Sequence, residues 1–403
     1  MNDPVLVKLI DQALARNNDL AQAALKVQKA RLQAGQAASN QLPSLSVQGS
    51  SSATRTHGVD GTTRSSAVSA SASWELDLWG RLATLRDAAD FEAEATEQDR
   101  QATAMALVGT VAADYWQVAY LNQRVAASAQ SIAYAKETLK LVRAQYTAGA
   151  ASKLEVAQAE QTVAAQEAAH TQWLQQRVEA RHALAILMDG PPGVAQDEAV
   201  RLPDGVLPEV PADVPASVLA RRPDLLAAQR RLREALATVD ATRVSYYPTF
   251  TLTGAVGGAS DSLSRVLDNP YGSIAGGLVL PFVQWRDMDR AVAISQADYD
   301  IAVRAYRQSW YQALADVENA LSARQQYEVQ GAHLAASLKA AQEAERLAEV
   351  RYRSGSVALK TWLDAQETRR TAENALAENR LNRLNAMATL YQVLGGGLQG
   401  QGA

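Results

Sequence analysis

Strict alternation of apolar and polar residues marks several short stretches of this chain as β-strands. From Val68 to Leu78 the even positions are Val, Ala, Ala, Trp, Leu and Leu, whereas the odd positions are Ser, Ser, Ser, Glu and Asp. This period of two is typical of a strand with one apolar and one polar face. We expect four strands, joined in pairs by polar loops, at about residues 44–54, 66–79, 249–257 and 272–282.

Long segments without proline follow each strand pair and predict unusually long helices. Between Leu82 and Tyr146 there is no proline and one glycine, Gly109. A helix of that length extends about 100 Å at roughly 1.5 Å per residue. Apolar residues recur within it at intervals of seven, which predicts packing against partner helices. The members of this heptad series are Val111, Val118, Val125, Ile132, Leu139 and Tyr146.

A glycine-containing break after each long helix predicts that the chain folds back on itself. In the first half, a break at 147–152 precedes a returning helix that ends at about residue 188. In the second half we expect a long helix at about 286–353, a break at Gly355 and a return over about 358–394. Each half therefore holds an initial helix, two strands and a pair of long helices.

The two halves of the chain are internal repeats of one pattern. The segment Leu14–Leu20 reappears as Leu219–Leu225 with the shared pattern LARxxDL, and YxxG at 146–149 reappears at 352–355. A period this long indicates a duplicated half-molecule rather than a solenoid of short repeats. Repeat one spans residues 1–205 and repeat two spans residues 206–403.

Composition narrows the function classes. A formal net charge of −4 gives no support for a nucleic-acid partner, and the lack of cysteine excludes disulfides and thiolate metal sites. No stretch approaches the roughly 18 consecutive apolar residues of a membrane-spanning helix. A membrane crossing would therefore use β-strands in a closed barrel. Four strands cannot close one alone, so we expect the chain to oligomerise.

Enzyme chemistry finds little support in the sequence. The four histidines lack metal-ligand spacing and a paired nucleophile. The glycines at 254–258 resemble a phosphate loop but lack the following Lys-Ser/Thr. We expect no catalysis, no metal and no other cofactor. The histidines are His57, His170, His182 and His333.

Several motifs, in order along nearly the whole chain, carry a resemblance to a known family. They are WELDLWGR at 74–81, RRPDL at 221–225, YYPTF at 246–250, RYxxG at 351–355, LDAQ at 363–366 and LYxxLGGG at 390–397. The chain resembles the TolC-like outer-membrane factors of efflux pumps. It is most similar to the lipoprotein branch that serves resistance-nodulation-division multidrug systems.

The resemblance implies a mainly α-helical fold with a membrane β-barrel, a homotrimer in the outer-membrane lipid bilayer and a periplasmic helical tunnel. Its implied partners are a periplasmic adaptor, or membrane fusion protein, and an inner-membrane efflux transporter. An equatorial belt would come from about 190–222 and 395–403. Family members of this branch begin with a signal peptide and a lipidated cysteine, which are missing before Pro4. We expect the lipid anchor in the natural precursor.

The resemblance also assigns site residues. It places a channel gate at Asp364 and a second acidic position of some relatives at Thr361. Aromatic residues near strand ends suit a membrane interface. They are Trp74, Trp79 and Trp285. The adaptor-docking tips would comprise Tyr146, Gly149, Ala150, Lys153, Tyr352, Gly355, Val357 and Lys360.

Each assignment has an alternative. Gly149 and Gly355 also suit a tight turn alone, and Asp364 also suits a surface pair with Lys360. A duct for type I protein secretion or for metal-ion efflux, and a structural trimeric coiled-coil fibre, are the competing functions.

Overall fold

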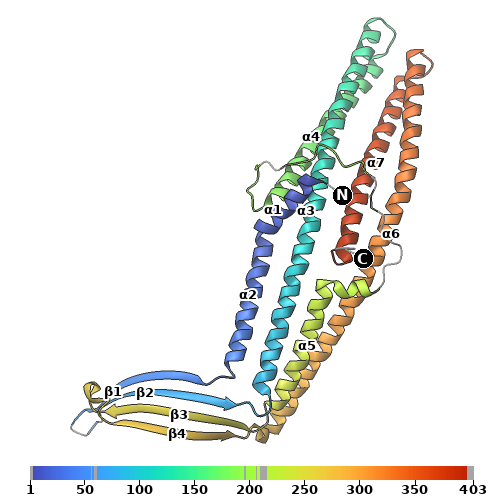
Figure 1. Cartoon of the computed structure of the whole chain (residues 1–403). Coiled ribbons are helices and arrows are strands. Elements are labelled where there is room, and N and C mark those ends of the chain that lie inside the picture. The colour runs from blue at the N-terminus through green and yellow to red at the C-terminus, as the bar shows by residue number, and fades with distance from the viewer. Residues whose placement is uncertain are drawn as a thin grey trace. The chain divides into compact units, whose positions relative to one another are not determined.

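The computed structural model describes residues 3–55, 57–58, 61–194, 197–205, 207–208 and 216–396. The helices are α1 (Pro4–Arg16), α2 (Asn18–Ser39), α3 (Arg81–Thr147), α4 (Lys153–Leu187), α5 (Pro223–Val244), α6 (Trp285–Arg353) and α7 (Leu359–Val393). The strands are β1 (Ser44–Thr54), β2 (Thr63–Leu76), β3 (Thr249–Ser260) and β4 (Pro270–Val279) (Figure 1). Much of the expected equatorial belt, at 195–196, 206, 209–215 and 397–403, lies outside the described residues.

Two strands end earlier than their alternating patterns predict. β2 stops at Leu76 because the carboxylate of Asp77 instead accepts hydrogen bonds from the backbone N–H groups of Leu82 and Ala83, at 3.0 and 2.8 Å, and caps α3. β4 stops at Val279, two residues before Pro281, which has no N–H group to donate to a strand ladder.

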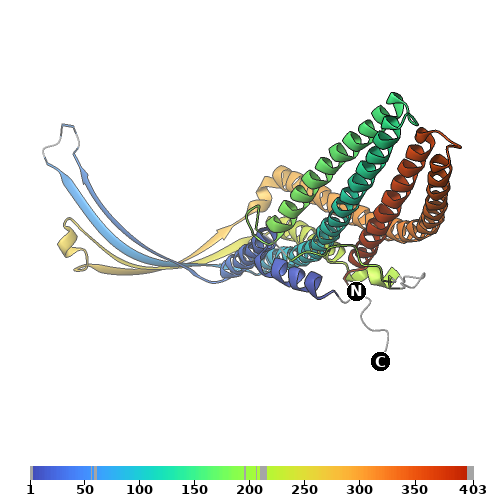
Figure 2. The same cartoon turned by 90° about the horizontal axis from the view of Figure 1, so that it is seen from above.

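The four strands form one antiparallel sheet in the order β1-β2-β3-β4 (Figure 1). Figure 2 shows the same strands from above. β2 of the first repeat pairs with β3 of the second, with Trp74 opposite Leu252 and Ala70 opposite Val256. Residues directly opposite one another share a face of a sheet. The register therefore places the apolar residues of both repeats on the same face.

The two faces of this sheet differ in chemistry. On one face, Leu45 of β1 is 82% exposed and Ile274 of β4 is 85% exposed. The other face is lined by hydroxyl groups that bond across strands, as in the 2.8 Å contact between the Oγ atoms of Ser46 and Ser71. An apolar face of this extent, open in the single chain, indicates contact with another protein surface or with lipid.

In the part of the chain that the structure describes, no helix is both long and apolar enough to cross a membrane.

The chain divides into two compact units, and each draws on both repeats. One unit comprises residues 1–22, 101–223 and 311–403, and the other comprises 23–100 and 224–310. The two sequence repeats therefore do not coincide with the two compact units. The first unit has a core built from α1, α3, α4 and α7, with its most buried side chains at Leu9, Val111, Val118, Leu121, Leu184 and Leu384.

The predicted heptad series follows the buried side of α3 only at its start. Val111 and Val118 are fully buried, whereas Tyr146 is 49% exposed. A straight helix drifts by about 20° per heptad from a strict period of 3.5. After five heptads the seam has moved to other residues, and Val142 takes the buried place near the end of α3.

Candidate functional site

The two helical tips, one between α3 and α4 and one between α6 and α7, have the same backbone turn. Gly149 and Gly355 adopt φ values of 76° and 75°, a left-handed conformation that glycine adopts without strain. The N–H of Ala150 donates to the carbonyl of Gln145, and the N–H of Ser356 donates to that of Arg351, both at 2.8 Å. Both breaks are thus Schellman turns, as the glycine spacing predicts.

The first tip presents its side chains to solvent. Tyr146, Gly149, Ala150 and Lys153 are all exposed. Ser152 caps α4 through a capping box, because its Oγ accepts from the N–H of Glu155 while the Glu155 carboxylate accepts from the N–H of Ser152. Leu154, which the sequence did not single out, is also exposed. This tip offers apolar contact area on a firmly capped turn.

The second tip differs from the first because its tyrosine is buried. Tyr352 is 7% exposed and stacks on Trp362, with ring centroids 5.3 Å apart and an interplanar angle of 27°. Its hydroxyl donates to Oε1 of Gln145 at 2.6 Å, which ties α6 to α3. Val357 packs against the same apolar cluster, and only Gly355 and Lys360 of the predicted docking residues are exposed here. The side chain of Tyr352 is therefore part of a core and not of a surface.

Burial in this cluster also changes acid–base behaviour. It raises the pKa of Tyr352, with a smaller contribution from Glu155. Tyr134, whose ring meets Trp362 edge to face at 6.4 Å, has its pKa raised to about 12, chiefly by burial. Both hydroxyls stay protonated at neutral pH and act as donors.

The gate candidates lie on the exposed side of α7. Asp364 and Thr361 are both exposed, and Nζ of Lys360 lies 2.9 Å from each carboxylate oxygen of Asp364. The opposite side of the helix is buried at spacings of three and four. It carries Leu359, Trp362, Gln366 and Arg370. The structure thus shows the ion pair with Lys360 and leaves the carboxylate accessible.

The sequence did not reveal two buried polar groups on the side of α7 opposite Asp364. The side-chain amide of Gln366 and Nε1 of Trp362 have no hydrogen-bond partner among the described residues. The spacing of Leu359, Trp362 and Gln366 along α7 is the signal that places them on one buried face.

The three tryptophans assigned to the membrane interface are exposed: Trp74 lies near the end of β2, Trp79 lies between β2 and α3, and Trp285 begins α6 after β4. Nε1 of Trp74 donates to the carbonyl of Gln41 at 2.9 Å, and Nε1 of Trp79 donates to that of Pro248 at 2.7 Å. The guanidinium of Arg286 lies 5.1 Å from the ring centroid of Trp285. Open rings with anchored N–H groups are typical of an interface between apolar and aqueous surroundings.

No metal centre is apparent within the described ranges, where no group of three or more His, Asp or Glu residues could hold an ion. His170 instead contacts Ser128, with its Nδ1 2.7 Å from the Ser128 Oγ.

Comparison with known proteins decides the family. The sequence profile described as outer membrane efflux protein matches residues 9–190 and 214–396, one segment in each repeat. The chain belongs to the outer membrane efflux protein family.

Individual relatives cover nearly the whole chain. It is 33% identical to the pyoverdine export outer membrane protein OpmQ of Pseudomonas putida, over 98% of this chain and 87% of that protein. It is 30% identical to the toxin and drug export protein A of Aggregatibacter actinomycetemcomitans, over 98% and 87%.

Solved structures agree with the fold. The open state of the Neisseria gonorrhoeae MtrE outer membrane channel superposes with a TM-score of 0.83 at 31% identity, covering 98% of this chain and 90% of that one. The outer-membrane channel OprN superposes with a TM-score of 0.89 at 26% identity, covering 98% and 91%.

These matches confirm the expected TolC-like fold, with four strands, long helical hairpins and two repeats. As a member of the outer membrane efflux protein family, the chain is an outer-membrane efflux channel with a periplasmic helical part. The family is one of channels and not of enzymes, and the coiled-coil fibre is the wrong alternative.

Proposed function

We propose that the chain works as a homotrimer that forms the exit duct of a tripartite efflux pump. An inner-membrane transporter delivers small molecules to it through a periplasmic adaptor. The observation that carries this proposal is the open sheet, whose edge strands β1 and β4 are exposed along their whole length. Unpaired strand edges are not tolerated in lipid, and pairing β4 of one copy with β1 of the next satisfies both edges.

The oligomer can be tested by measuring mass in mild detergent. We expect trimers from the parent chain, together with discrete conductance steps in a planar bilayer. Val47→Pro removes one backbone N–H group from the edge strand β1 and should weaken the trimer. Val47→Thr keeps the backbone N–H group, so it is the control and should assemble normally. A parent chain that forms only monomers or dimers would refute the proposal.

Small-molecule cargo is favoured by the relative named for pyoverdine export and by the word drug in the name of the toxin and drug export protein A. The word toxin in that name does not separate small molecules from proteins. Deleting the gene in a strain that depends on it should raise susceptibility to small organic toxins. Sensitivity to metal salts alone would instead favour the metal-efflux alternative.

The adaptor is proposed to dock on the first tip, because Tyr146, Ala150 and Leu154 are exposed there together. Ala150→Trp should block docking and remove drug resistance while the trimer content stays normal. Ala133→Trp, at an exposed alanine within α3, is the matched control and should leave resistance intact. Resistance that survives Ala150→Trp would count against this docking surface.

Asp364 is proposed to form the gate, with three copies making a ring of carboxylates that attracts cations. Asp364→Asn keeps the shape and removes the charge, so it should raise open probability or weaken block by divalent cations. Thr361→Ala and Lys360→Ala are the controls, and neither should weaken the block. Single-channel traces of Asp364→Asn that match the parent at low and high salt would remove Asp364 from the gate.

A further inference from the structure

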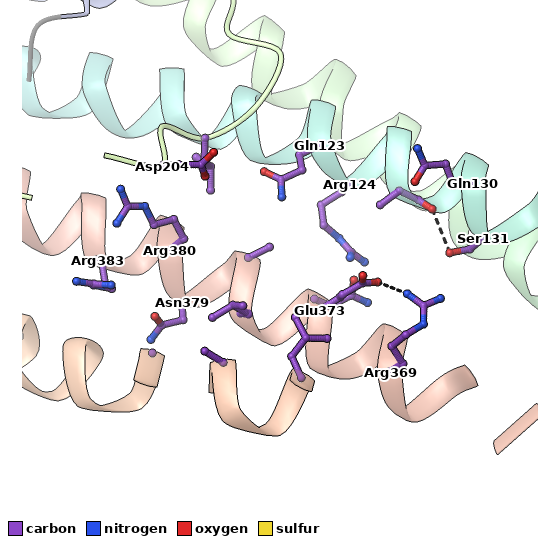
Figure 3. Close-up of a pocket in the computed structure, with 18 of the residues that line it drawn as sticks. Gln123, Arg124, Gln130, Ser131, Asp204, Arg369, Glu373, Asn379, Arg380 and Arg383 are labelled. Carbon is purple, nitrogen blue, oxygen red and sulfur yellow. Dashed lines mark hydrogen bonds and ion pairs between the residues drawn. The ribbon is translucent and has the colours of Figure 1, made fainter. Parts of the chain in front are cut away.

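A pocket of about 870 Å³ lies between α3, α6 and α7, entirely within one compact unit (Figure 3). Its volume falls in the range of roughly 300 to 1,000 Å³ that small-molecule sites occupy. Apart from Tyr134, which also contacts Trp362 near the second tip, its residues do not belong to the tips, the gate or the sheet described above. It therefore needs an account of its own.

Arg124 of α3 is the deepest charged group of this pocket. The residue is 7% exposed, and its guanidinium lies 4.2 Å from the ring centroid of Trp173. Its Nε has no hydrogen-bond partner among the described residues, although Glu373 and Glu378 both attract its charge. Burial lowers the pKa of Arg124, although an arginine stays charged at neutral pH. Burial of this charge outweighs the attraction of those two carboxylates, so an entering anion would stabilise it further.

The acidic side chains around the pocket do not cancel this charge. Asp204 and Glu328 are exposed at its rim, where water screens them. Glu373 already accepts a hydrogen bond from Nη1 of Arg369 at 2.7 Å. Figure 3 shows Arg124 reaching from α3 toward the α7 residues Arg369 and Glu373. Among the residues that line the pocket are four arginines (Arg124, Arg369, Arg380 and Arg383) and three carboxylates (Asp204, Glu328 and Glu373), so the lining carries one excess positive charge.

Part of the lining is apolar, and this part sets the kind of anion that fits. Small and branched aliphatic side chains from three helices face the space beside the arginines. They are Ala127, Ala332, Ala335, Leu338, Leu376 and Ala377. An inorganic ion would leave this surface uncovered, whereas an organic anion would cover it.

Gly331 of α6 keeps this part of the pocket open. A Cβ atom at this position would lie 2.8 Å from Oδ1 of Asn379 and 3.7 Å from Nη1 of Arg383. Asn379 bridges the two helices through its Nδ2, which donates to the carbonyl of Tyr327 at 3.0 Å. The missing side chain of Gly331 and the fixed position of Asn379 therefore keep the space beside Arg383 open.

We propose that this pocket binds small amphipathic organic carboxylates, with the carboxylate held by the guanidinium of Arg124 and the apolar body against the alanine and leucine wall. The planar fork of arginine matches a carboxylate with two parallel hydrogen bonds. The identification of such anions as exported substrates rests on the proposed efflux function. The binding itself does not.

The test measures binding of 2-naphthoate to the detergent-solubilised protein by equilibrium dialysis. The neutral alcohol 2-naphthylmethanol reports partition into micelles. Arg124→Gln should weaken naphthoate binding by about tenfold or more, as expected for loss of a charge-assisted hydrogen bond. Arg346→Gln, an exposed arginine of α6 paired with Glu343, is the matched control and should change nothing.

Equal naphthoate affinity in the parent and in Arg124→Gln would overturn the proposal. If Arg124→Gln fails to assemble, Ala335→Trp fills the pocket and keeps the charge, and it should also abolish binding. A third outcome is that the parent does not bind naphthoate and that Arg124→Gln weakens the trimer. Arg124 would then pair with a carboxylate of a neighbouring copy, and the ligand site would be refuted. Loss of parent conductance, by contrast, would refute the efflux function and leave the binding result standing.

Discussion

The two helical tips have the same backbone and different interiors. Both turn at a glycine of nearly equal φ, Gly149 or Gly355, with the same pair of hydrogen bonds. Yet Tyr146 is exposed in the first tip, and the matching Tyr352 is buried in the second. A duplicated sequence has thus kept its turn while the same side chain became surface in one copy and core in the other.

Neighbouring substitutions explain the difference. Where α7 has Trp362, the corresponding position of α4 has Val156, which offers no ring for a tyrosine to stack on. The capping also differs, since Ser152 and Glu155 form a capping box whereas Ala358 makes no side-chain cap. The first tip is thus held by the capping box, and the second is held by the packing of Tyr352 on Trp362.

The largest expected contrast comes from removing the two tyrosines. Tyr352→Ala should lower the free energy of local opening at the second tip by about 3 kcal/mol, because it leaves a cavity beside Trp362. Tyr146→Ala should change the first tip by less than about 0.5 kcal/mol. Amide hydrogen exchange in the first turns of α4 and α7 measures both. Equal losses in the two variants would show that the tips are packed alike.

Alanine at the two glycines should instead have equal effects. Gly149→Ala and Gly355→Ala should each cost about 1 to 2 kcal/mol, the cost of a left-handed backbone in a residue with a Cβ. No other atom lies within 4 Å of a Cβ built at either position, so the cost is purely conformational. Hydrogen exchange at Ala150 and Ser356 reports the outcome. A much larger effect at one glycine would reveal a contact that the other lacks.

The cap should matter at one tip only. Ser152→Ala should destabilise the first turn of α4 by about 1 kcal/mol through loss of the capping box. Its counterpart, Ala358→Ser, should stabilise α7 by no more than that amount. Exchange rates at Glu155 and Thr361 follow the two helix starts. No change at Glu155 would mean that packing, and not the cap, holds the first tip.

The smallest effect is expected from the surface ion pair of the second tip. Lys360→Ala should change local stability by only about 0.2 to 0.5 kcal/mol, because both side chains are exposed and lie four residues apart on a helix. Raising the salt concentration should remove even this difference. A loss several times larger would mean that the pair is coupled to the core around Trp362.

Most of the fold could be predicted from the sequence, because alternation and helix breakers act locally. The strand and helix patterns and the glycine turns follow from residues that are neighbours in the chain. The burial of Tyr352 could not be predicted this way, since it depends on Gln145 and Trp362, which come from different helices. Arg124 was missed for the same reason. Its burial arises where three helices that are distant in sequence enclose one space.

The hydroxyl-lined face of the sheet has a consequence for which solutes can cross. Its central positions are serine and threonine, such as Ser71, Ser73 and Thr253, and Glu75 at its end is neutralised by a bidentate contact from Arg81. In a barrel with its apolar face toward lipid, this face lines the lumen. Hydroxyl groups both donate and accept, so such a wall can hydrate anions, cations and neutral molecules alike. If the strands close into such a barrel, they form a conduit whose wall favours neither sign of charge.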